Sequence, residues 1–218
     1  MYPSIIYDNF FDNPDAVVEY AKSLEYHMND GRWPGARTKD LSEINPELKE
    51  NIARRIVNIF FPDRMATWYS QMTFQEVWPM HDDQYHIKNR GWIHLDCSVQ
   101  FGGIIYLDKN PAEDTGTSLY RLKSTHYQHT DNEEKTKRRY YGGEEVSDEE
   151  YAKYFHSTEE YFEETVTVKN VYNRLFLFSG NQYHGVKTFG PKGTSRLTLP
   201  FFFNWVNHVC HQGPYYRE

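Results

Sequence analysis

The sequence predicts a mainly β fold, of the β-sandwich or jelly-roll kind, buttressed by helices near the N-terminus. Three observations carry this prediction. Two helix-start signals lie within the first 50 residues, short aromatic and β-branched segments follow from about residue 66 to residue 204, and one long polar stretch interrupts them. A chain that begins with helices and continues with many strands and one insertion is typical of a two-layered or closed β structure with helical support. A length of 218 residues suits a single domain.

The two helices are predicted from their start signals and from the spacing of the apolar residues that follow. Residues 13–15 (Asn-Pro-Asp) and 45–47 (Asn-Pro-Glu) each supply an N-cap, a proline at the first helical position and an acid in the first turn. Pro62 ends the second helix. The apolar stripes, which we expect to pack on the β structure, are Val17, Tyr20, Ala21, Leu24 and Met28, then Leu48, Ile52, Ile56, Ile59 and Phe60.

Short segments with strand character fill the rest of the chain on both sides of the polar stretch. We predict strands at 72–78, 92–100, 103–107 and 117–122, and again at 165–171, 174–179, 184–188 and 195–204. The expected organisation is one domain, with helical support in 1–65, a β core in 66–123 and 165–204, an insertion in 124–164 and a C-terminal tail in 205–218.

The formal net charge of −7 lies in one stretch of the chain. Residues 124–165 hold 12 acidic and 5 basic side chains, which leaves 19 of each sign in the remainder. A neutral body with an acidic appendage argues against nucleic acid as a partner, because phosphate binding needs a basic patch.

The insertion allows two interpretations. Ser147 and Glu150 form a capping box that predicts one amphipathic helix there. The segment is then either a solvated surface element or a lid over the mouth of the β core. A basic cluster at 135–139, followed by Tyr-Tyr-Gly-Gly at 140–143, is a further candidate for gripping an acidic or aromatic partner. We expect His126, His129 and His156 to be solvated.

Several classes of protein are excluded by composition. No apolar run approaches the twenty or so residues of a membrane-spanning helix, and residues 1–10 lack the basic and apolar regions of a signal peptide. The two cysteines, Cys97 and Cys210, cannot form a disulfide scaffold and are expected to be ordinary thiols in a reducing compartment. We therefore expect a cytoplasmic protein without membrane contact.

A candidate metal site begins in residues 92–101, where apolar and polar side chains alternate. His94 and Asp96 fall on the polar face of this predicted strand, roughly 6 to 7 Å apart, whereas Cys97 falls on the apolar face and is expected to be buried. A second His-x-Asp pair, His81 and Asp83, stands in a polar stretch without alternation. The context therefore favours the pair at 94 and 96.

The second half of the chain supplies the remaining candidates. His184 begins a return strand after the turn at 179–182, and alternation in 195–204 places Arg196 and Thr198 opposite the apolar face. An inward arginine is costly unless it meets an anion. That anion is either a carboxylate of the protein or the carboxylate of a substrate or cosubstrate.

Two histidines and one carboxylate on one face make the ligand set of non-haem Fe(II) oxygenases. The chain resembles the Fe(II)/2-oxoglutarate-dependent dioxygenases, and especially the small prolyl-hydroxylase-like type found in phages and bacteria. This resemblance covers roughly residues 66–204 and leaves 124–165 unmatched. It is carried by 92–96 (WIHLD), 101–108 (FGGIIYLD), 116–120 (GTSLY), 173–178 (NRLFLF), 183–184 (YH) and 195–204 (SRLTLPFFFN).

The resemblance implies a double-stranded β-helix, a cupin-like jelly roll, and the oxidation of a substrate by O2 with decarboxylation of 2-oxoglutarate to succinate and CO2. By position it implies that His94, Asp96 and His184 bind Fe(II) and that Arg196 clamps 2-oxoglutarate. Tyr106 and Thr198 are candidates for further hydrogen bonds to the cosubstrate or within the barrel. The prolyl hydroxylases proper often use lysine at the clamp position, so the arginine argues against a specifically prolyl substrate.

Two other functional classes stay open at the level of the sequence. One is a cupin-like metalloprotein such as an isomerase, which would have no need of an inward Arg196. The other is a catalytically inactive relative that binds a ligand. The primary substrate is expected to be a small molecule or a peptide.

Overall fold

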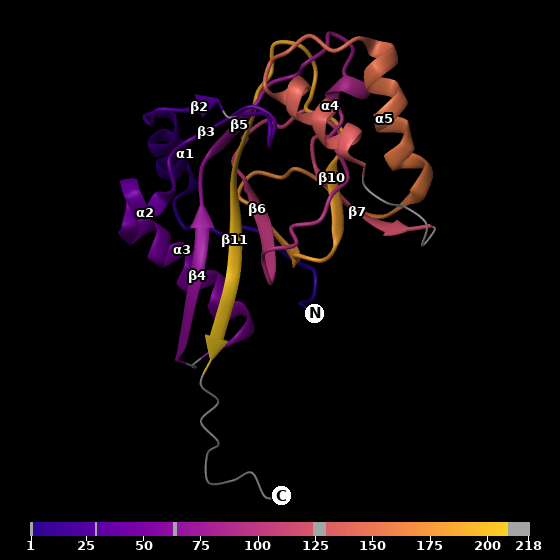
Figure 1. The fold of residues 1–218 in the computed structure, drawn as a ribbon. Coiled ribbons are helices and arrows are strands. Elements are labelled where there is room, and N and C mark those ends of the chain that lie inside the picture. The colour runs from indigo at the N-terminus through magenta and orange to yellow at the C-terminus, as the bar shows by residue number, and fades with distance from the viewer. Residues whose placement is uncertain (1, 29, 63–64, 124–129, 209–218) are drawn as a thin grey trace, which may run out of the picture.

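The computed structural model describes residues 2–28, 30–62, 65–123 and 130–208, and of residues 156–159 only the backbone. The fold is mainly β with several helices, as predicted (Figure 1). The helices are α1 (Pro14–Lys22), α2 (Leu41–Ile44), α3 (Pro46–Phe60), α4 (Asp131–Tyr141) and α5 (Asp148–Tyr161), with a 3-10 turn at Ile87–Asn89. The strands are β1 (Ile5–Tyr7), β2 (His27–Met28), β3 (Ala36–Arg37), β4 (Ala66–Met72), β5 (Gln75–Val77), β6 (Phe101–Tyr106), β7 (Thr117–Leu122), β8 (Phe162–Val168), β9 (Leu175–Ser179), β10 (Tyr183–Val186) and β11 (Arg196–His208).

The strands form two antiparallel sheets. The larger sheet has the order β1-β9-β6-β11-β5-β3-β2, with β4 also paired to β11, and the smaller has the order β10-β7-β8. The central strand β11 pairs with β6 along one edge and with β5 and then β4 along the other. Residues that belong to distant parts of the sequence therefore meet along β11.

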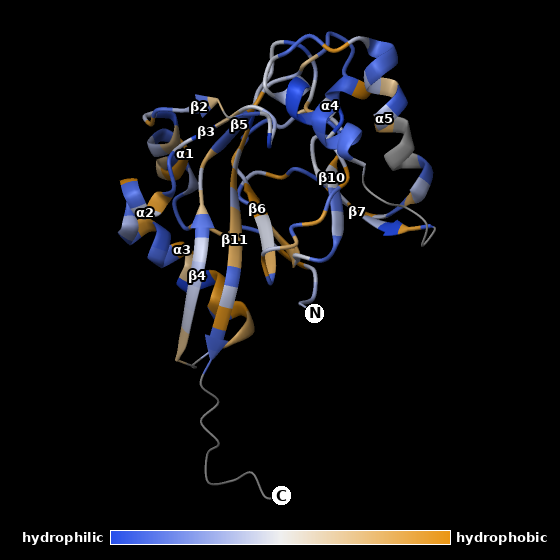
Figure 2. Cartoon of the chain, viewed as in Figure 1, coloured by the Kyte–Doolittle hydropathy of each residue, from blue (hydrophilic) through white to orange (hydrophobic). Residues whose placement is uncertain are grey.

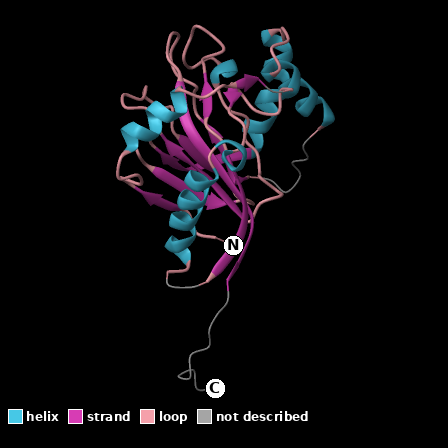
Figure 3. Cartoon of the chain, turned by 90° about the vertical axis from the view of Figure 1, so that its left-hand side faces the viewer, coloured by secondary structure: helices cyan, strands magenta, loops and turns pink. Residues whose placement is uncertain are grey.

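Helices α1 and α3 cover the outer face of the larger sheet (Figure 3). The buried side chains of α3, among them Ile52 and Ile56, join the same apolar cluster as Phe101 and Phe201 of the sheet. Both predicted caps are present, because Asn13 Oδ1 accepts the Ala16 N–H and Asn45 Oδ1 accepts the Leu48 N–H. The N-terminal helices thus buttress the β structure, as expected from their apolar stripes. Met28 is the exception, because α1 ends at Lys22 and Met28 lies in β2 with 62% of its surface exposed.

The predicted strand at 92–100 is wrong. Within it only His94 makes a β-bridge, to His184, and the chain then turns, with the Val99 N–H donating to the Asp96 carbonyl. The alternation is real, but the backbone groups of this segment find partners in a turn and in the loop after β9 instead of a continuous ladder. Cys97 is consequently exposed, not buried as predicted. Cys210, His126 and His129 lie outside the described residues.

The other predicted strands are present with shifted ends. The segment 72–78 is divided between β4 and β5, with Thr73 and Phe74 between them. Strand β7 has the predicted bounds, whereas β8 begins at Phe162 and not at residue 165.

The insertion holds two helices where the sequence analysis expects one. Helix α5 begins at the predicted capping box, where Ser147 Oγ accepts the Glu150 N–H. Helix α4 begins with a second capping box between Thr130 and Glu133. This helix is strongly polar, without a continuous apolar stripe (Figure 2), which is why periodicity alone does not reveal it. Among the described residues, no helix combines the length and apolar character needed to cross a bilayer.

The cap of α3 gives a test of the helical support. We expect Asn45→Ala to lower the free energy of unfolding by about 1 kcal/mol, because the Leu48 N–H loses its acceptor. The matched control is Asn58→Ala on the exposed side of the same helix, which should change stability by only a few tenths of a kcal/mol. Urea unfolding measures both. Equal effects of the two substitutions would show that the cap contributes nothing specific.

Candidate active site

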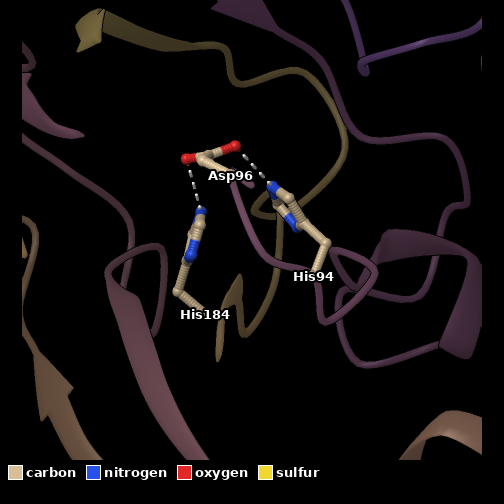
Figure 4. A group of neighbouring side chains, drawn as sticks. All are labelled: His94, Asp96 and His184. Carbon is tan, nitrogen blue, oxygen red and sulfur yellow. Dashed lines mark ion pairs between the residues drawn. The ribbon is translucent and has the colours of Figure 1, made fainter. Parts of the chain in front are cut away.

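The structure brings His94, Asp96 and His184 together. One ligand atom of each lies within 4.8 Å of the others. The two oxygens of Asp96 are divided between the rings, with Oδ1 3.8 Å from His94 Nε2 and Oδ2 3.5 Å from His184 Nε2 (Figure 4). Two imidazoles and one carboxylate thus converge on one small volume, although they come from different halves of the chain.

The backbone, not side-chain packing alone, fixes this convergence. His94 and His184 exchange two N–H···O hydrogen bonds of 3.0 Å, so their rings lie with centroids 4.3 Å apart. The Asp96 N–H donates to the Gly180 carbonyl at 2.9 Å. A Cβ on Gly180 would lie 2.2 Å from the Val99 carbonyl oxygen, so only glycine allows this close approach of the two loops.

The hydrogen bonds of the two rings determine which nitrogen faces the carboxylate. His94 Nδ1 lies 2.8 Å from the Trp92 carbonyl and His184 Nδ1 lies 3.0 Å from the Gln182 carbonyl. A carbonyl oxygen can only accept, so in the neutral rings each Nδ1 carries the proton and each Nε2 directs a lone pair toward Asp96. Backbone carbonyls orient metal-binding histidines in this way.

The electrostatics of the cluster favour a cation between the three side chains. Burial lowers the pKa of His94, and the adjacent His184 lowers it further, while Asp96 opposes both effects. These effects favour the neutral form of His94, and the Nε2 atoms of both rings face the oxygens of Asp96. Among the described residues, no lysine or arginine is within ion-pair distance of Asp96. This set of donors fits a divalent metal ion.

The second His-x-Asp pair has a local role in the structure. His81 Nδ1 accepts the Asp83 N–H at 3.1 Å, and its ring stacks on His86 with centroids 3.7 Å apart. Within the described part of the chain, no other group of three or more His, Cys, Asp or Glu side chains brings its ligand atoms as close together as His94, Asp96 and His184 do.

A cavity of about 290 Å³ opens beside the three side chains. Arg196 lies in its lining, 3% exposed, with Nε donating to the Thr115 carbonyl at 2.8 Å and the guanidinium carbon 5.5 Å from the centroid of the Tyr106 ring. Its Nη2 atom is buried and has no hydrogen-bond partner among the described residues. Burial lowers the pKa of Arg196, against the opposing effects of Tyr106 and Asp108. A buried guanidinium with a free donor beside a cavity fits an anionic ligand.

Tyr106 and Thr198 are buried but do not belong to the lining of the cavity. The Tyr106 hydroxyl donates to Thr117 Oγ1 at 2.8 Å, and the Thr198 hydroxyl lies 3.5 Å from the Gln75 carbonyl. Thr117 itself lines the cavity, as do Arg37 and Lys137, and the sequence analysis does not identify any of the three as site residues. From the sequence, Lys137 is predicted only as part of the basic cluster at 135–139. No local pattern marks these positions, because they reach the cavity through tertiary packing.

Comparison with known proteins identifies similar folds. A family profile described as a family of unknown function (DUF6445) matches residues 2–203. Among curated proteins, none matches the sequence. A prolyl hydroxylase from Trichoplax adhaerens, solved with a peptide fragment of the hypoxia inducible factor oxygen degradation domain, is 11% identical with a TM-score of 0.53, over 92% of this chain and 82% of that one.

HygX from Streptomyces hygroscopicus is similar at the same level. Its structure with nickel and 2-oxoglutarate bound is 13% identical with a TM-score of 0.57, over 92% of this chain and 82% of that one. A further structure of HygX holds hygromycin B in addition and is 11% identical with the same TM-score. The resemblance to Fe(II)/2-oxoglutarate dioxygenases that the sequence indicates is thus confirmed for the fold.

The close approach at Gly180 gives a test of how the site is held. We expect Gly180→Ala to lower the free energy of unfolding by about 1–3 kcal/mol, because the new methyl group collides with the backbone of the Asp96 loop. The neighbouring control Asn181→Ala, at an exposed turn position, should stay within about 0.5 kcal/mol of the parent. Urea unfolding distinguishes the two. Equal stability of Gly180→Ala and the parent would show that the loops do not depend on this contact.

Proposed function

The chain belongs to the DUF6445 family, and from its own side chains we propose that it is a non-haem Fe(II)- and 2-oxoglutarate-dependent oxygenase that hydroxylates a substrate. The observation that carries the proposal is the pair of Nε2 lone pairs facing the Asp96 carboxylate, beside the free Nη2 of Arg196. The similarity in fold to a nickel- and 2-oxoglutarate-bound enzyme supports it. We further assign the two facing sheets to a double-stranded β-helix.

Each residue has a specific role in this proposal. His94, Asp96 and His184 bind Fe(II) and leave coordination positions open on the cavity side. A bound Fe(II) would supply the O2 chemistry that couples decarboxylation of 2-oxoglutarate to succinate and CO2 with oxidation of the substrate. Arg196 binds the far carboxylate of 2-oxoglutarate through its free Nη2. Tyr106 packs against the guanidinium, and its hydrogen bond to Thr117 holds the ring in place.

The insertion serves as a lid in this proposal. Tyr141 and Lys137 of α4 reach the lining of the cavity. The two helices are anchored by a buried aromatic cluster in which Trp92 Nε1 donates to the Tyr151 hydroxyl at 3.0 Å and Phe155 packs against the Trp92 ring. A cover docked through such a cluster excludes water from the reacting groups.

The oxygenase is favoured over a cupin-like isomerase by the position of Arg196. An isomerase acting on one substrate at the metal has no use for a second, fully buried cation that keeps a free donor. A buried charge of this kind is costly unless a ligand pairs with it. A dicarboxylate cosubstrate accounts for both the metal-facing and the arginine-facing ends of the cavity.

Removing one metal ligand tests the iron site. We expect His94→Ala to lose stoichiometric Fe(II) binding under anaerobic conditions, because one of three ligands is absent. His81→Ala is the matched control, since it removes a histidine from the other His-x-Asp pair and should leave iron binding unchanged. Iron retained per protein after desalting is the measurement. If only the control His81→Ala lost iron, the metal would be bound at the His81 and Asp83 pair and the proposed site would be wrong.

Removing the clamp tests the cosubstrate site. We expect Arg196→Ala to retain Fe(II) but to weaken 2-oxoglutarate binding by about 2 to 4 kcal/mol, as for the loss of a buried charged partner. Arg121→Ala, which removes an exposed arginine paired with Glu163, should not change it. Titration of the visible metal-to-ligand charge-transfer band measures this affinity. Iron-loaded parent protein without such a band would favour the isomerase class, and a band without succinate formation would favour an inactive relative.

A further inference from the structure

The side chains that line the cavity carry more positive charge than the proposed metal ion and 2-oxoglutarate would neutralise. Arg37, Lys137 and Arg196 all line it, and Asp96 is the one acidic side chain in the described lining. A fourth cation, Arg32, is 61% exposed and pairs with Asp30 at 3.1 Å. A divalent metal ion and a dicarboxylate cancel each other in charge. An excess of two positive charges therefore persists in the cavity when both are bound.

Arg37 is held in place but is not paired with an anion. Its guanidinium carbon lies 4.3 Å from the centroid of the Trp33 ring and 5.8 Å from that of Phe202, and Nη2 donates to Gln75 Oε1 at 3.2 Å. Its Nε is buried without a hydrogen-bond partner among the described residues. Burial lowers the pKa of Arg37 to about 10, with Asp96 opposing the change. A side chain fixed by packing, with a donor left over, is preorganised for a ligand.

Lys137 approaches the same cavity from the insertion. It lies on α4, and no carboxylate of the described residues is within ion-pair distance of its Nζ. Burial lowers its pKa, while Glu134 of the same helix and Asp96 across the cavity raise it and Arg138 lowers it. Asp96 thus raises the pKa of both Lys137 and Arg37. In the proposed function the same carboxylate also binds the metal ion.

The two cations belong to parts of the chain that meet above the cavity. Gly31, in the loop before β3, has a φ of +86°, and a Cβ there would lie 1.8 Å from the Arg138 carbonyl oxygen of α4. This contact docks the Arg37 segment against the Lys137 helix. Arg37 lies in β3, near the edge of the larger sheet, and Lys137 lies on α4 of the insertion. Both side chains line the cavity, so two separate segments bring their charges to it.

We propose that Arg37 and Lys137 form a recognition site for the primary substrate, which is a small anion carrying a carboxylate or phosphate group on an apolar body. The neighbouring aromatic surfaces of Trp33 and Phe202 suit the apolar part. This inference rests on the proposed function for the identity of the reaction, but the anion site itself is defined by this chain's own side chains.

The experiment measures anion binding without turnover. Benzoate, phenyl phosphate and neutral benzamide are titrated calorimetrically into full-length protein, first without added metal and then with Zn(II) and saturating 2-oxoglutarate. We expect one of the anions to bind at least about ten-fold more tightly than benzamide, and to keep this preference when 2-oxoglutarate fills the Arg196 site. The stronger of the two anions identifies the acid group.

Substitutions locate the binding. Arg37→Gln and Lys137→Gln should each weaken anion binding by about ten-fold or more and leave benzamide unchanged, and Lys137→Arg should restore most of the loss. Lys135→Gln, an exposed position of the same helix, is the control for net charge and should have no effect.

Several outcomes would overturn the inference. The first is that neither anion binds more tightly than benzamide. The second is that Lys135→Gln weakens anion binding as much as Lys137→Gln does. The third is that Arg37→Gln loses affinity for metal or 2-oxoglutarate but still binds the anions. If the probes bind as expected but 2-oxoglutarate binds in no variant, the anion site stands and the proposed oxygenase fails.

Discussion

The Nε2 atoms of two imidazole rings face the two oxygens of one carboxylate, and the rest of the site depends on this arrangement. Because both Nδ1 atoms are engaged by backbone carbonyls, neither ring can turn to relieve it. A cation at the centre of this cluster would interact favourably with the carboxylate and with both ring nitrogens. The backbone pairing of His94 with His184 and the close contact at Gly180 maintain the arrangement, and the Phe178 ring packs against His184.

The buried cations of the cavity complement this cluster. Arg196 lies in the β core, where β11 holds it beside Tyr106, and its position is tied to the sheet. Arg37 and Lys137 come instead from the edge of the sheet and from the insertion. If the proposed roles hold, the residues for metal and cosubstrate come from β10, β11 and the loop before β6, whereas those for the substrate come from the edge of the sheet and from the insertion.

The sequence allowed the fold class, both N-terminal helices and the convergence of His94, Asp96 and His184 to be predicted. The alternation that pointed to His94 and Asp96 does not reflect a continuous strand, because the chain bridges once at His94 and then turns. The inward position of Arg196 followed from true alternation in β11. Arg37 could not be predicted, since β3 is two residues long and has no periodicity to read. Helix α4 lacks an apolar stripe, yet its capping box at Thr130 and Glu133 was a readable signal.

The location of a bound metal tests the account most directly. Crystals grown with Ni(II) and 2-oxoglutarate would be measured at the nickel absorption edge, and the anomalous difference map would locate the ion. The account predicts one strong peak about 2.1 Å from the Nε2 atoms of His94 and His184 and from one oxygen of Asp96. A peak at His81 and His86 instead, or no peak at the three side chains at equimolar nickel, would contradict it.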